Sequence, residues 1–384
     1  MPVYNGERTI ADAIGSILAQ SFTDFELLIL DDASTDGTDA ILAQFNDPRL
    51  RVIRNSHNLK IVRTLNQGLD LAQGDYIARM DADDISLKDR FEIQNAYLDA
   101  HPEIGIVGSH IEMFGECPSH IHLCPETHEA IVAHSFFQNP MAHPSVMMRR
   151  SALAGAHYSE DYPFAEDWEF WRRLSTSTRL ANLQQALVKY RVSAPSAPSP
   201  EAGLGKERVL RENAAALGLS ARDRQMYALL ADHNIPSLES LTDMEAFLRN
   251  ARSRNDELRL YPKKEFNLEI GQQWLLCCRT IWSSDPRGWK VFLRSPLHKL
   301  GGMTRKEIWR IRIRRNLGQL RRKVALRSRL RSALRFLVRF IYFPIRVLLY
   351  FIRFPMRVVR YLRRRAALRT RITRLLRHVL NRPS

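Results

Sequence analysis

The chain has 384 residues, enough for two or three folded units of about 150 residues each. Hydrophobic residues make up 45% and charged residues 26% of the sequence, which excludes a fibrous or largely disordered chain. Residues 301–384 hold 26 of the 58 Lys and Arg residues but only one of the 41 acidic residues. This segment therefore carries +25 and residues 1–300 carry −8, so we expect the tail, and not the body, to bind an anionic partner.

The cysteines and the first residues bear on the compartment. Cys117, Cys124, Cys277 and Cys278 follow neither the spacing of a zinc site nor that of a disulfide framework, which favours a reducing compartment. The opening residues MPVYNGERTI have neither the basic segment nor the apolar core of a secretory signal. We therefore expect no export.

Residues 1–190 alternate short apolar runs with stretches of helical periodicity. The apolar stripe that begins at Ile10 predicts a helix, and the run Phe25–Leu30 predicts a buried strand that ends in turn-forming residues. The later predicted elements, in chain order, are a helix from Ser34 or Thr35 towards Phe45, a strand at Arg51–Arg54, a helix at Ile61–Ala72, a strand at Tyr76–Met80, a helix at Leu87–Ala100 and a strand at Ile104–Gly108.

Strands that alternate with helices of about 10 to 15 residues are typical of βαβ units. We therefore predict an α/β fold with a Rossmann-like, mostly parallel sheet flanked by helices. Ligands bind such sheets at the carboxyl ends of the strands, where the acidic residues 31–32 and 81–84 lie. The Pro/Ser stretch at 194–200 predicts a linker between this domain, at 1–193, and a helical region at 201–300.

The segment GDYIARMDADD, residues 74–84, contains the strongest local signal. Asp81 and Asp83 are alternate residues after a predicted strand, so they should project together, which suits a divalent cation that also binds phosphate oxygens. With Asp84 they place three carboxylates within four residues, and these repel each other unless a cation is present. The alternative is a solvated acidic turn that caps the helix beginning near Leu87.

Two other segments carry paired acids. In FELLILDDASTDGT, Ser34 and Asp36 can cap the next helix, but capping does not require the pair Asp31 and Asp32. One carboxylate of this pair could accept a hydrogen bond from a base N–H or a ribose hydroxyl.

In PFAEDWEFWRRL, Glu166 and Asp167 begin a helix. The helix dipole alone explains acids in a first turn, and the same ionisation would keep either acid ready as a general base.

These motifs together resemble the family 2 glycosyltransferases, which have the GT-A nucleotide-diphospho-sugar transferase fold. The matching segments are 2–38, 72–84, 143–153 and 165–174, in the order and spacing of the family. The resemblance covers roughly residues 1–192, half of the chain, and is specific for the family but not for the donor or the acceptor.

The resemblance implies roles for individual positions. It assigns nucleotide-sugar binding to Pro2, Tyr4, Glu7, Asp32 and Asp81, with Asp32 reading the base. Asp81 and Asp83 also match the pair of acids that binds Mn²⁺ or Mg²⁺ on the donor diphosphate.

The resemblance also implies the catalytic base. Asp167, beside Glu166, matches the acid that deprotonates the acceptor hydroxyl, so the pair is the expected catalytic site. His143 could lie near the acceptor, but a lone His beside a strand is more often structural.

Family members usually carry an apolar strand just before the Pro-Val-Tyr-Asn turn, whereas this sequence starts inside that turn. Either the true start lies upstream of Met1 or the sheet lacks a strand beside the nucleotide pocket. We expect the first, because an empty strand position would strip hydrogen bonds from the sheet and leave a large cavity.

The basic tail at 301–384 has a helical pattern of its own. Arg339, Arg346, Arg353 and Arg360 recur every seven residues among large apolar residues, which predicts one polar stripe on an amphipathic helix. No apolar run exceeds six residues, far below the roughly 20 needed to span a bilayer. We expect binding to an anionic membrane surface; the alternatives are nucleic acid and a helical hairpin packed on a partner subunit.

The sequence therefore predicts a metal-dependent, inverting glycosyltransferase that uses a nucleotide-diphosphate sugar, expected to be UDP-linked. Its acceptor would be a glycan or a lipid-linked glycan of the bacterial cell envelope. We expect a peripheral or monotopic protein at the cytoplasmic face of the inner membrane, with no nucleic-acid partner. The alternatives are a catalytically inactive GT-A domain that acts as a membrane-bound scaffold and a nucleotidyltransferase on a related fold.

Overall fold

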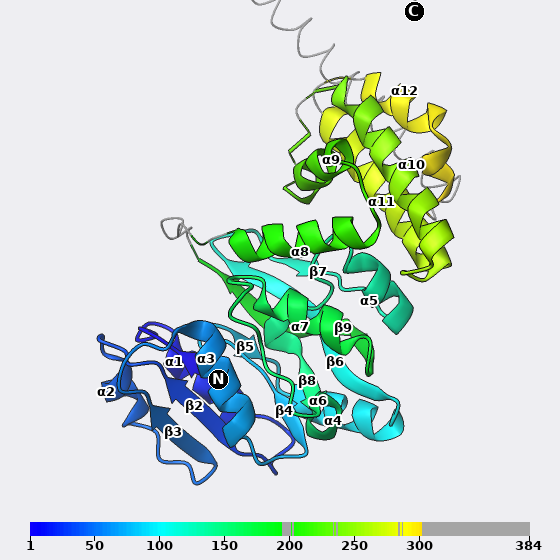
Figure 1. Cartoon of the computed structure of the whole chain (residues 1–384). Helices are drawn as coiled ribbons and strands as arrows, with labels where there is room; N and C mark the ends of the chain where they lie inside the picture. The colour runs from blue at the N-terminus through cyan, green and yellow to red at the C-terminus, as the bar shows by residue number, and fades with distance from the viewer. Residues whose placement is uncertain are drawn as a thin grey trace, which may run out of the picture. The chain divides into compact units, whose positions relative to one another are not determined.

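A computed structural model describes residues 1–193, 201, 203–232, 234–235, 237–282, 285 and 287–301 (Figure 1). These residues belong to one compact unit. The predicted linker at 194–200 and the predicted tail beyond residue 301 lie outside the described residues. The predicted domain boundaries therefore stay predictions.

A small parallel sheet opens the fold. Its strand order is β1 (Pro2–Val3), β2 (Leu27–Asp31) and β3 (Leu50–Arg54). The central strand β2 is buried along its whole length, as expected for a Leu/Ile run that is covered on both faces. Helix α1 (Ile10–Leu18) connects β1 to β2, α2 (Thr38–Leu42) connects β2 to β3, and α3 (Lys60–Leu71) follows β3 (Figure 1).

A second, larger sheet follows. Its order is β4 (Tyr76–Ala78), β8 (Met147–Arg149), β6 (Ile104–Gly115), β9 (Arg179–Val192) and β5 (Ile85–Ser86), with β7 (His120–His122) paired to β6. The helices of this part are α4 (Arg90–Ala100), α5 (His128–His134), α6 (Arg150–Leu153) and α7 (Glu166–Leu174). Helix α7 turns Phe170, Trp171 and Leu174 into the core, which fixes the position of its first turn.

The predicted α/β fold is confirmed, and its elements occur in the predicted order. The pairing is less uniformly parallel than predicted, because in the second sheet only β6 and β9 run parallel. Strand β8 shows the reason. It has three residues and runs antiparallel to both neighbours, and a run this short has no sequence period from which its pairing could be inferred.

The remaining described residues are helical, as predicted. The helices are α8 (Leu204–Ala216), α9 (Ala221–Ala231), α10 (Ser240–Leu258), α11 (Lys263–Trp282) and α12 (Arg287–Arg294). Phe136, which follows α5, stacks on Tyr227 of α9 at 4.7 Å and meets Phe266 of α11 edge-on at 5.3 Å, so an aromatic cluster joins these helices to the α/β part.

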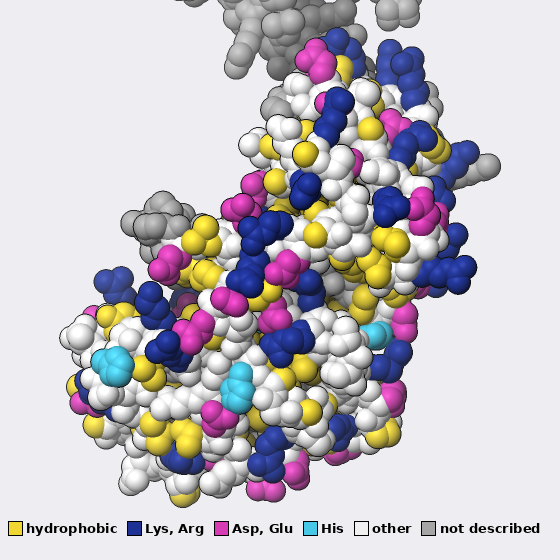
Figure 2. Space-filling model, in the orientation of Figure 1, with side chains coloured by type: hydrophobic (Ala, Val, Ile, Leu, Met, Phe, Trp, Pro, Cys, Tyr) yellow, Lys and Arg dark blue, Asp and Glu magenta, His cyan; other side chains and the backbone are white. Residues whose placement is uncertain are grey.

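The surface and the helix lengths bear on the predicted membrane role. Residues 1–300 carry a net charge of −8. On the face drawn in Figure 2, their acidic and basic side chains are interspersed. Within the described ranges, no helix is both long enough and apolar enough to cross a bilayer.

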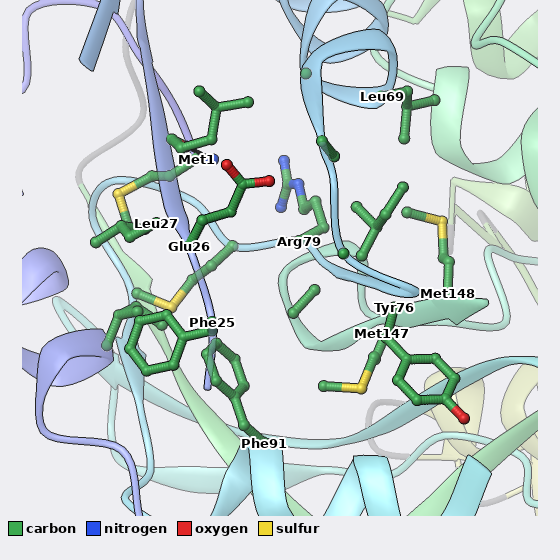
Figure 3. A pocket seen from close by; sticks show the side chains of 18 of the residues that line it. Met1, Phe25, Glu26, Leu27, Leu69, Tyr76, Arg79, Phe91, Met147 and Met148 are labelled. Atoms are coloured by element: carbon green, nitrogen blue, oxygen red, sulfur yellow. Dashed lines mark hydrogen bonds between the residues drawn. The ribbon is translucent and has the colours of Figure 1, made fainter. Parts of the chain in front are cut away.

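The two sheets are separated by a cavity. The described residues place no strand between β2 and β4, and a cavity of about 580 Å³ lies there, lined by both strands and by α3 (Figure 3).

Candidate active site

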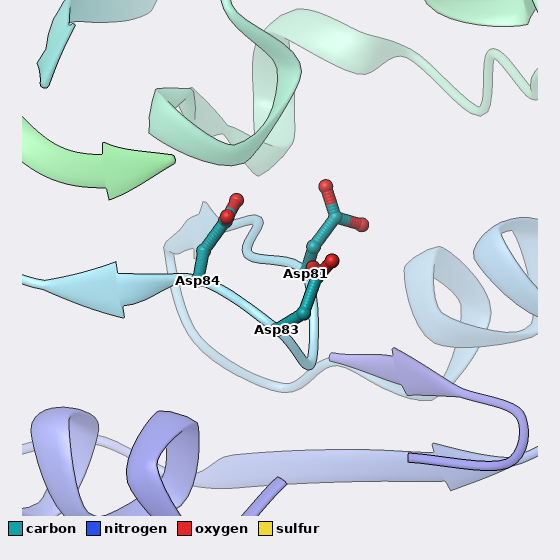
Figure 4. A group of neighbouring side chains, drawn as sticks. All are labelled: Asp81, Asp83 and Asp84. Atoms are coloured by element: carbon teal, nitrogen blue, oxygen red, sulfur yellow. The ribbon is translucent and has the colours of Figure 1, made fainter. Parts of the chain in front are cut away.

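The loop between β4 and β5 brings three carboxylates together. Side-chain oxygens of Asp81, Asp83 and Asp84 lie within 4.8 Å of one another (Figure 4). In the part of the chain that the structure describes, this is the only group of three or more His, Cys, Asp or Glu side chains close enough to share a metal ion. The sequence singled out Asp81 and Asp83 as metal ligands and placed Asp84 beside them, and in the structure all three carboxylates lie together.

The electrostatics of this group suit a cation. Burial, and then the charge of Asp81, raises the pKa of Asp84 to about 8, and the same two causes raise the pKa of Asp83. Oδ1 of Asp84 accepts a hydrogen bond from the amide of Arg191 at 2.8 Å, whereas its Oδ2 is buried without a partner. An unsatisfied carboxylate oxygen among like charges is what a hard divalent cation would relieve, so the residues present fit such an ion.

A cleft of about 500 Å³ adjoins the acidic loop. It is lined by residues 2–9, Asp36, residues 81–83 and Ser193. It thus brings together five of the residues that the resemblance assigned to the donor or the metal, which are Pro2, Tyr4, Glu7, Asp81 and Asp83. Tyr4 is 52% exposed beside it, so its ring is free to receive a planar ligand.

Glu7 braces the wall of this cleft. Its Oε2 accepts a hydrogen bond from the amide of Gly37 at 2.8 Å, and its own amide donates to Oδ2 of Asp36 at 3.0 Å. A Cβ at position 37 would lie 2.9 Å from the same Glu7 oxygen, so glycine allows this close approach. The carboxylate of Glu7 therefore ties the loop after β1 to the loop after β2.

Asp32 is used inside the fold. Its Oδ1 accepts hydrogen bonds from Asn55 Nδ2 and the Leu59 amide, both at 2.8 Å, and its Oδ2 accepts from the Lys60 amide at 2.9 Å. It is 4% exposed and does not line the cleft. The bonds from Leu59 and Lys60 stabilise the start of α3. The role of Asp32 in reading a base stays a prediction.

Glu166 and Asp167 begin α7, as predicted. Asp167 Oδ2 accepts a hydrogen bond from Asn139 Nδ2 at 2.6 Å, and its Oδ1 accepts from the amide of Trp168 at 2.7 Å. Burial raises the pKa of Asp167, and the bond from Asn139 opposes this effect. Burial, and then the charge of Asp167, raises the pKa of Glu166 to about 7, and one Glu166 oxygen is buried without a partner.

Arg79 couples the two acidic groups electrostatically. It is buried and forms an ion pair with Asp81. Its charge also opposes the rise that burial causes in the pKa of Glu166 and of Asp167. The Arg79 guanidinium thus acts on both the proposed metal ligand and the proposed base.

His143 lies against the same site. Its Nδ1 is 3.9 Å from Asp167 Oδ2, and its Nε2 is 3.0 Å from the hydroxyl of Tyr158. Burial, and then the charge of Arg79, lowers the pKa of His143 well below its ordinary value, so the ring is neutral. The sequence pointed to His143 as a candidate but gave no sign of Asn139, which is separated from Asp167 by 28 positions in the chain.

Comparison with known proteins points to one family. The family model described as glycosyl transferase family 2 matches residues 1–154. An uncharacterized glycosyltransferase of Haemophilus influenzae is 34% identical over 228 residues, which cover 55% of this chain and 70% of that protein. The putative glycosyltransferase EpsE of Bacillus subtilis is 39% identical over 200 residues, which cover 50% of this chain and 71% of that protein.

Two further similarities are more limited. The Escherichia coli UDP-Glc:alpha-D-GlcNAc-diphosphoundecaprenol beta-1,3-glucosyltransferase WfgD is 37% identical over 94 residues, which cover 24% of this chain and 37% of that protein. The crystal structure of S. aureus TarS in complex with UDP-GlcNAc aligns with 74% of this chain and 89% of that chain, at a TM-score of 0.49 and 19% identity. A structural similarity this loose does not bear on individual residues.

Proposed function

Because this chain belongs to glycosyltransferase family 2, we propose that it transfers a sugar from a nucleotide-diphosphate sugar to a hydroxyl group of a glycan or lipid-linked acceptor in bacterial cell-envelope polysaccharide biosynthesis. The observation that carries this proposal is the position of the acidic group Asp81, Asp83 and Asp84 beside the cleft formed by residues 2–9. A donor with an anionic diphosphate and a planar base matches a cleft that offers a cation site at one wall and an exposed tyrosine at another.

The nature of the donor and acceptor is supported by a relative. The printed name of the Escherichia coli protein WfgD specifies UDP-glucose and a diphosphoundecaprenol-linked sugar. We infer a UDP-linked donor and a lipid-linked glycan acceptor of the same chemical class for this chain.

Asp81, Asp83 and Asp84 would hold Mn²⁺ or Mg²⁺. Such an ion, when bound there, would supply positive charge to the departing diphosphate. The three carboxylates supply hard oxygen ligands, which both ions prefer.

Asp167 is the proposed catalytic base. The bonds from Asn139 and Trp168 and the charge of Arg79 favour its ionised form against the effect of burial, so it can take the proton of the acceptor hydroxyl. Glu166, with its pKa near 7, is partly protonated at neutral pH, which limits the repulsion between the two neighbours. The freed acceptor oxygen attacks the anomeric carbon opposite the leaving diphosphate, and the configuration inverts.

We further propose that residues 301–384 hold the enzyme at the cytoplasmic face of the inner membrane, as a peripheral or monotopic protein. The net charge of +25 and the seven-residue spacing of Arg339, Arg346, Arg353 and Arg360 support this proposal. Flotation of the full chain with anionic but not neutral vesicles, and its loss on truncation after residue 300, is the expected result. Binding of the full chain to DNA without flotation would contradict it.

A donor screen tests the proposed reaction. The purified chain, with Mn²⁺ and a set of nucleotide sugars, should release free nucleoside diphosphate and glycosylate a lipid-linked acceptor. Release of pyrophosphate would instead indicate a nucleotidyltransferase. Donor binding without any turnover would indicate an inactive scaffold.

A further inference from the structure

Arg191, the second-last residue of β9, lies against the acidic loop of Figure 4. Strand β5 begins directly after Asp84 and pairs antiparallel with β9, with Ile85 opposite Lys189. This register carries the end of β9 past the loop, so Arg191 meets Asp84 and Asp83, which lie 107 and 108 positions away in the chain. The end of β9 is therefore the neighbouring segment on which the acidic loop rests.

Arg191 makes two hydrogen bonds to this loop, and neither uses up the oxygens that a cation needs. Its amide donates to Oδ1 of Asp84 at 2.8 Å, and its Nε donates to the backbone carbonyl of Asp83 at 2.8 Å. The first bond fixes the direction of the other Asp84 oxygen, Oδ2, which is buried without a partner. The second bond fixes the peptide between Asp83 and Asp84 through its carbonyl, so Arg191 leaves the carboxylate of Asp83 available to an ion.

The guanidinium of Arg191 is itself held in place. It lies over the ring of Phe114, its partner in the pairing of β6 with β9, at 4.7 Å from the ring centroid. One terminal nitrogen is 3.7 Å from Oδ2 of Asp12 in α1. A guanidinium is planar and carries its donors in a fixed geometry, so these contacts also fix the direction of the Nε–H that reaches Asp83.

The charge and the hydrogen bonds of Arg191 should affect a bound cation in opposite directions. Arg79 forms an ion pair with the carboxylate of Asp81, whereas Arg191 forms its ion pair with Asp12, outside the acidic group. By its charge alone, Arg191 would repel a divalent cation at the loop and weaken its binding. By its hydrogen bonds it would strengthen the binding, because it holds the ligands in one arrangement. The two effects differ in sign, so a measurement can separate them.

We propose that Arg191 is a positioning residue that holds Asp83 and Asp84 in a cation-binding arrangement before the cation arrives. It is not itself a ligand, because a guanidinium has no lone pair to offer a metal ion. The inference rests on the proposed function, since it takes the acidic group as the metal site. Loss of a group that orients metal ligands typically weakens metal binding by about 10- to 100-fold.

Two substitutions in the full chain test this role. Arg191→Gln removes the charge and the Nε donor, whereas Arg191→Lys keeps the charge but lacks the planar fork. Arg179→Gln is the matched control, because it removes an arginine from the opposite end of β9, where Arg179 pairs with Glu129 at 2.8 Å. Mn²⁺ affinity without donor is measured by electron paramagnetic resonance of the free ion. Amide hydrogen exchange of residues 81–86 is measured in the metal-free chain.

Both Arg191 variants should bind Mn²⁺ more weakly than the parent chain, by about 10- to 100-fold for Arg191→Gln. Residues 81–86 should exchange about tenfold faster or more in Arg191→Gln, and Arg179→Gln should match the parent in both measurements. Unchanged or tighter Mn²⁺ binding in Arg191→Gln, unchanged exchange, or parental values for both in Arg191→Lys would overturn the proposal. Absence of Mn²⁺ binding in the parent chain would overturn the metal site itself, so the two failures are distinguishable.

Discussion

Replacing Asn139 by alanine should slow sugar transfer by weakening the ionised form of Asp167. The Asn139 amide donates to Asp167 Oδ2 over 2.6 Å, and the Asp167 side chain is 15% exposed, so water replaces this donor poorly. Without it, the pKa of Asp167, already raised by burial, rises further, and a protonated Asp167 cannot accept the acceptor's proton.

The size of the effect follows from the type of bond. A hydrogen bond to a charged group is worth about 1.5 to 3 kcal/mol. At about 1.4 kcal/mol for each factor of ten, Asn139→Ala should lower kcat/KM by roughly 10- to 100-fold near neutral pH. The deficit should shrink as pH rises, because ionisation of Asp167 is then restored by the solution.

The assay is kcat/KM for nucleotide release, measured from about pH 5 to about pH 9. The acid limb of the profile should move to higher pH in Asn139→Ala. Asn95→Ala is the matched control, because it removes an Asn–Asp hydrogen bond of 3.2 Å at an exposed position, and its profile should equal that of the parent chain. A loss of activity that is the same at every pH, or no loss at all, would mean that Asn139 does not act through the ionisation of Asp167.

Three further changes have defined outcomes. Asp167→Asn should abolish transfer but leave the donor affinity, measured by calorimetry, nearly intact. Asp83→Ala should weaken Mn²⁺-dependent donor binding. Equal loss of donor binding in both variants would contradict the two roles. The pKa of Glu166 is about 7 in the folded state against an ordinary value of 4.5, so the folded state binds this proton more tightly than the unfolded state does. The free energy of unfolding therefore falls by about 3 kcal/mol in all as pH rises between these two values. Glu166→Gln should therefore unfold at a higher denaturant concentration than the parent at pH 8 and lose this advantage towards pH 4.5, and a pH-independent difference would count against it. The side chain of Phe136 has 0% exposure, so Phe136→Ala should lower the free energy of unfolding by about 3 to 5 kcal/mol in denaturant titrations. A decrease below about 1 kcal/mol would mean that the aromatic cluster does not hold the helices on the α/β part.

The local elements of the fold could be predicted because their residues carry a period or a composition of their own. The run that forms β2 is uniformly apolar and buried, and α1 shows a complete helical stripe. Strand direction could not be predicted in the same way. Whether β8 pairs in parallel or antiparallel depends on contacts between segments about 70 residues apart, such as Ile77 with Met148, and these leave no local signature.

The candidate site was predictable where its residues are neighbours in sequence. Asp81 and Asp83 could be paired from their spacing, but Asp84 joins them through a fold of the loop that also buries it. Asn139 gave no signal, since it contacts Asp167 only because α7 packs against the segment after α5. The motif also gave no sign that the Asp32 carboxylate accepts three hydrogen bonds, one from Asn55 after β3 and two from the start of α3.

We propose that the acidic loop after β4 holds a cation on the donor diphosphate and that Asp167 is the base. Anomalous diffraction from crystals of the full chain grown with Mn²⁺ and UDP tests it most directly. We predict one strong manganese peak bonded to oxygens of the Asp81, Asp83 and Asp84 group and to the diphosphate, with UDP in the cleft of residues 2–9. Bound UDP with no manganese at these carboxylates, or manganese bound at some other place, would mean that the acidic loop is not the metal site.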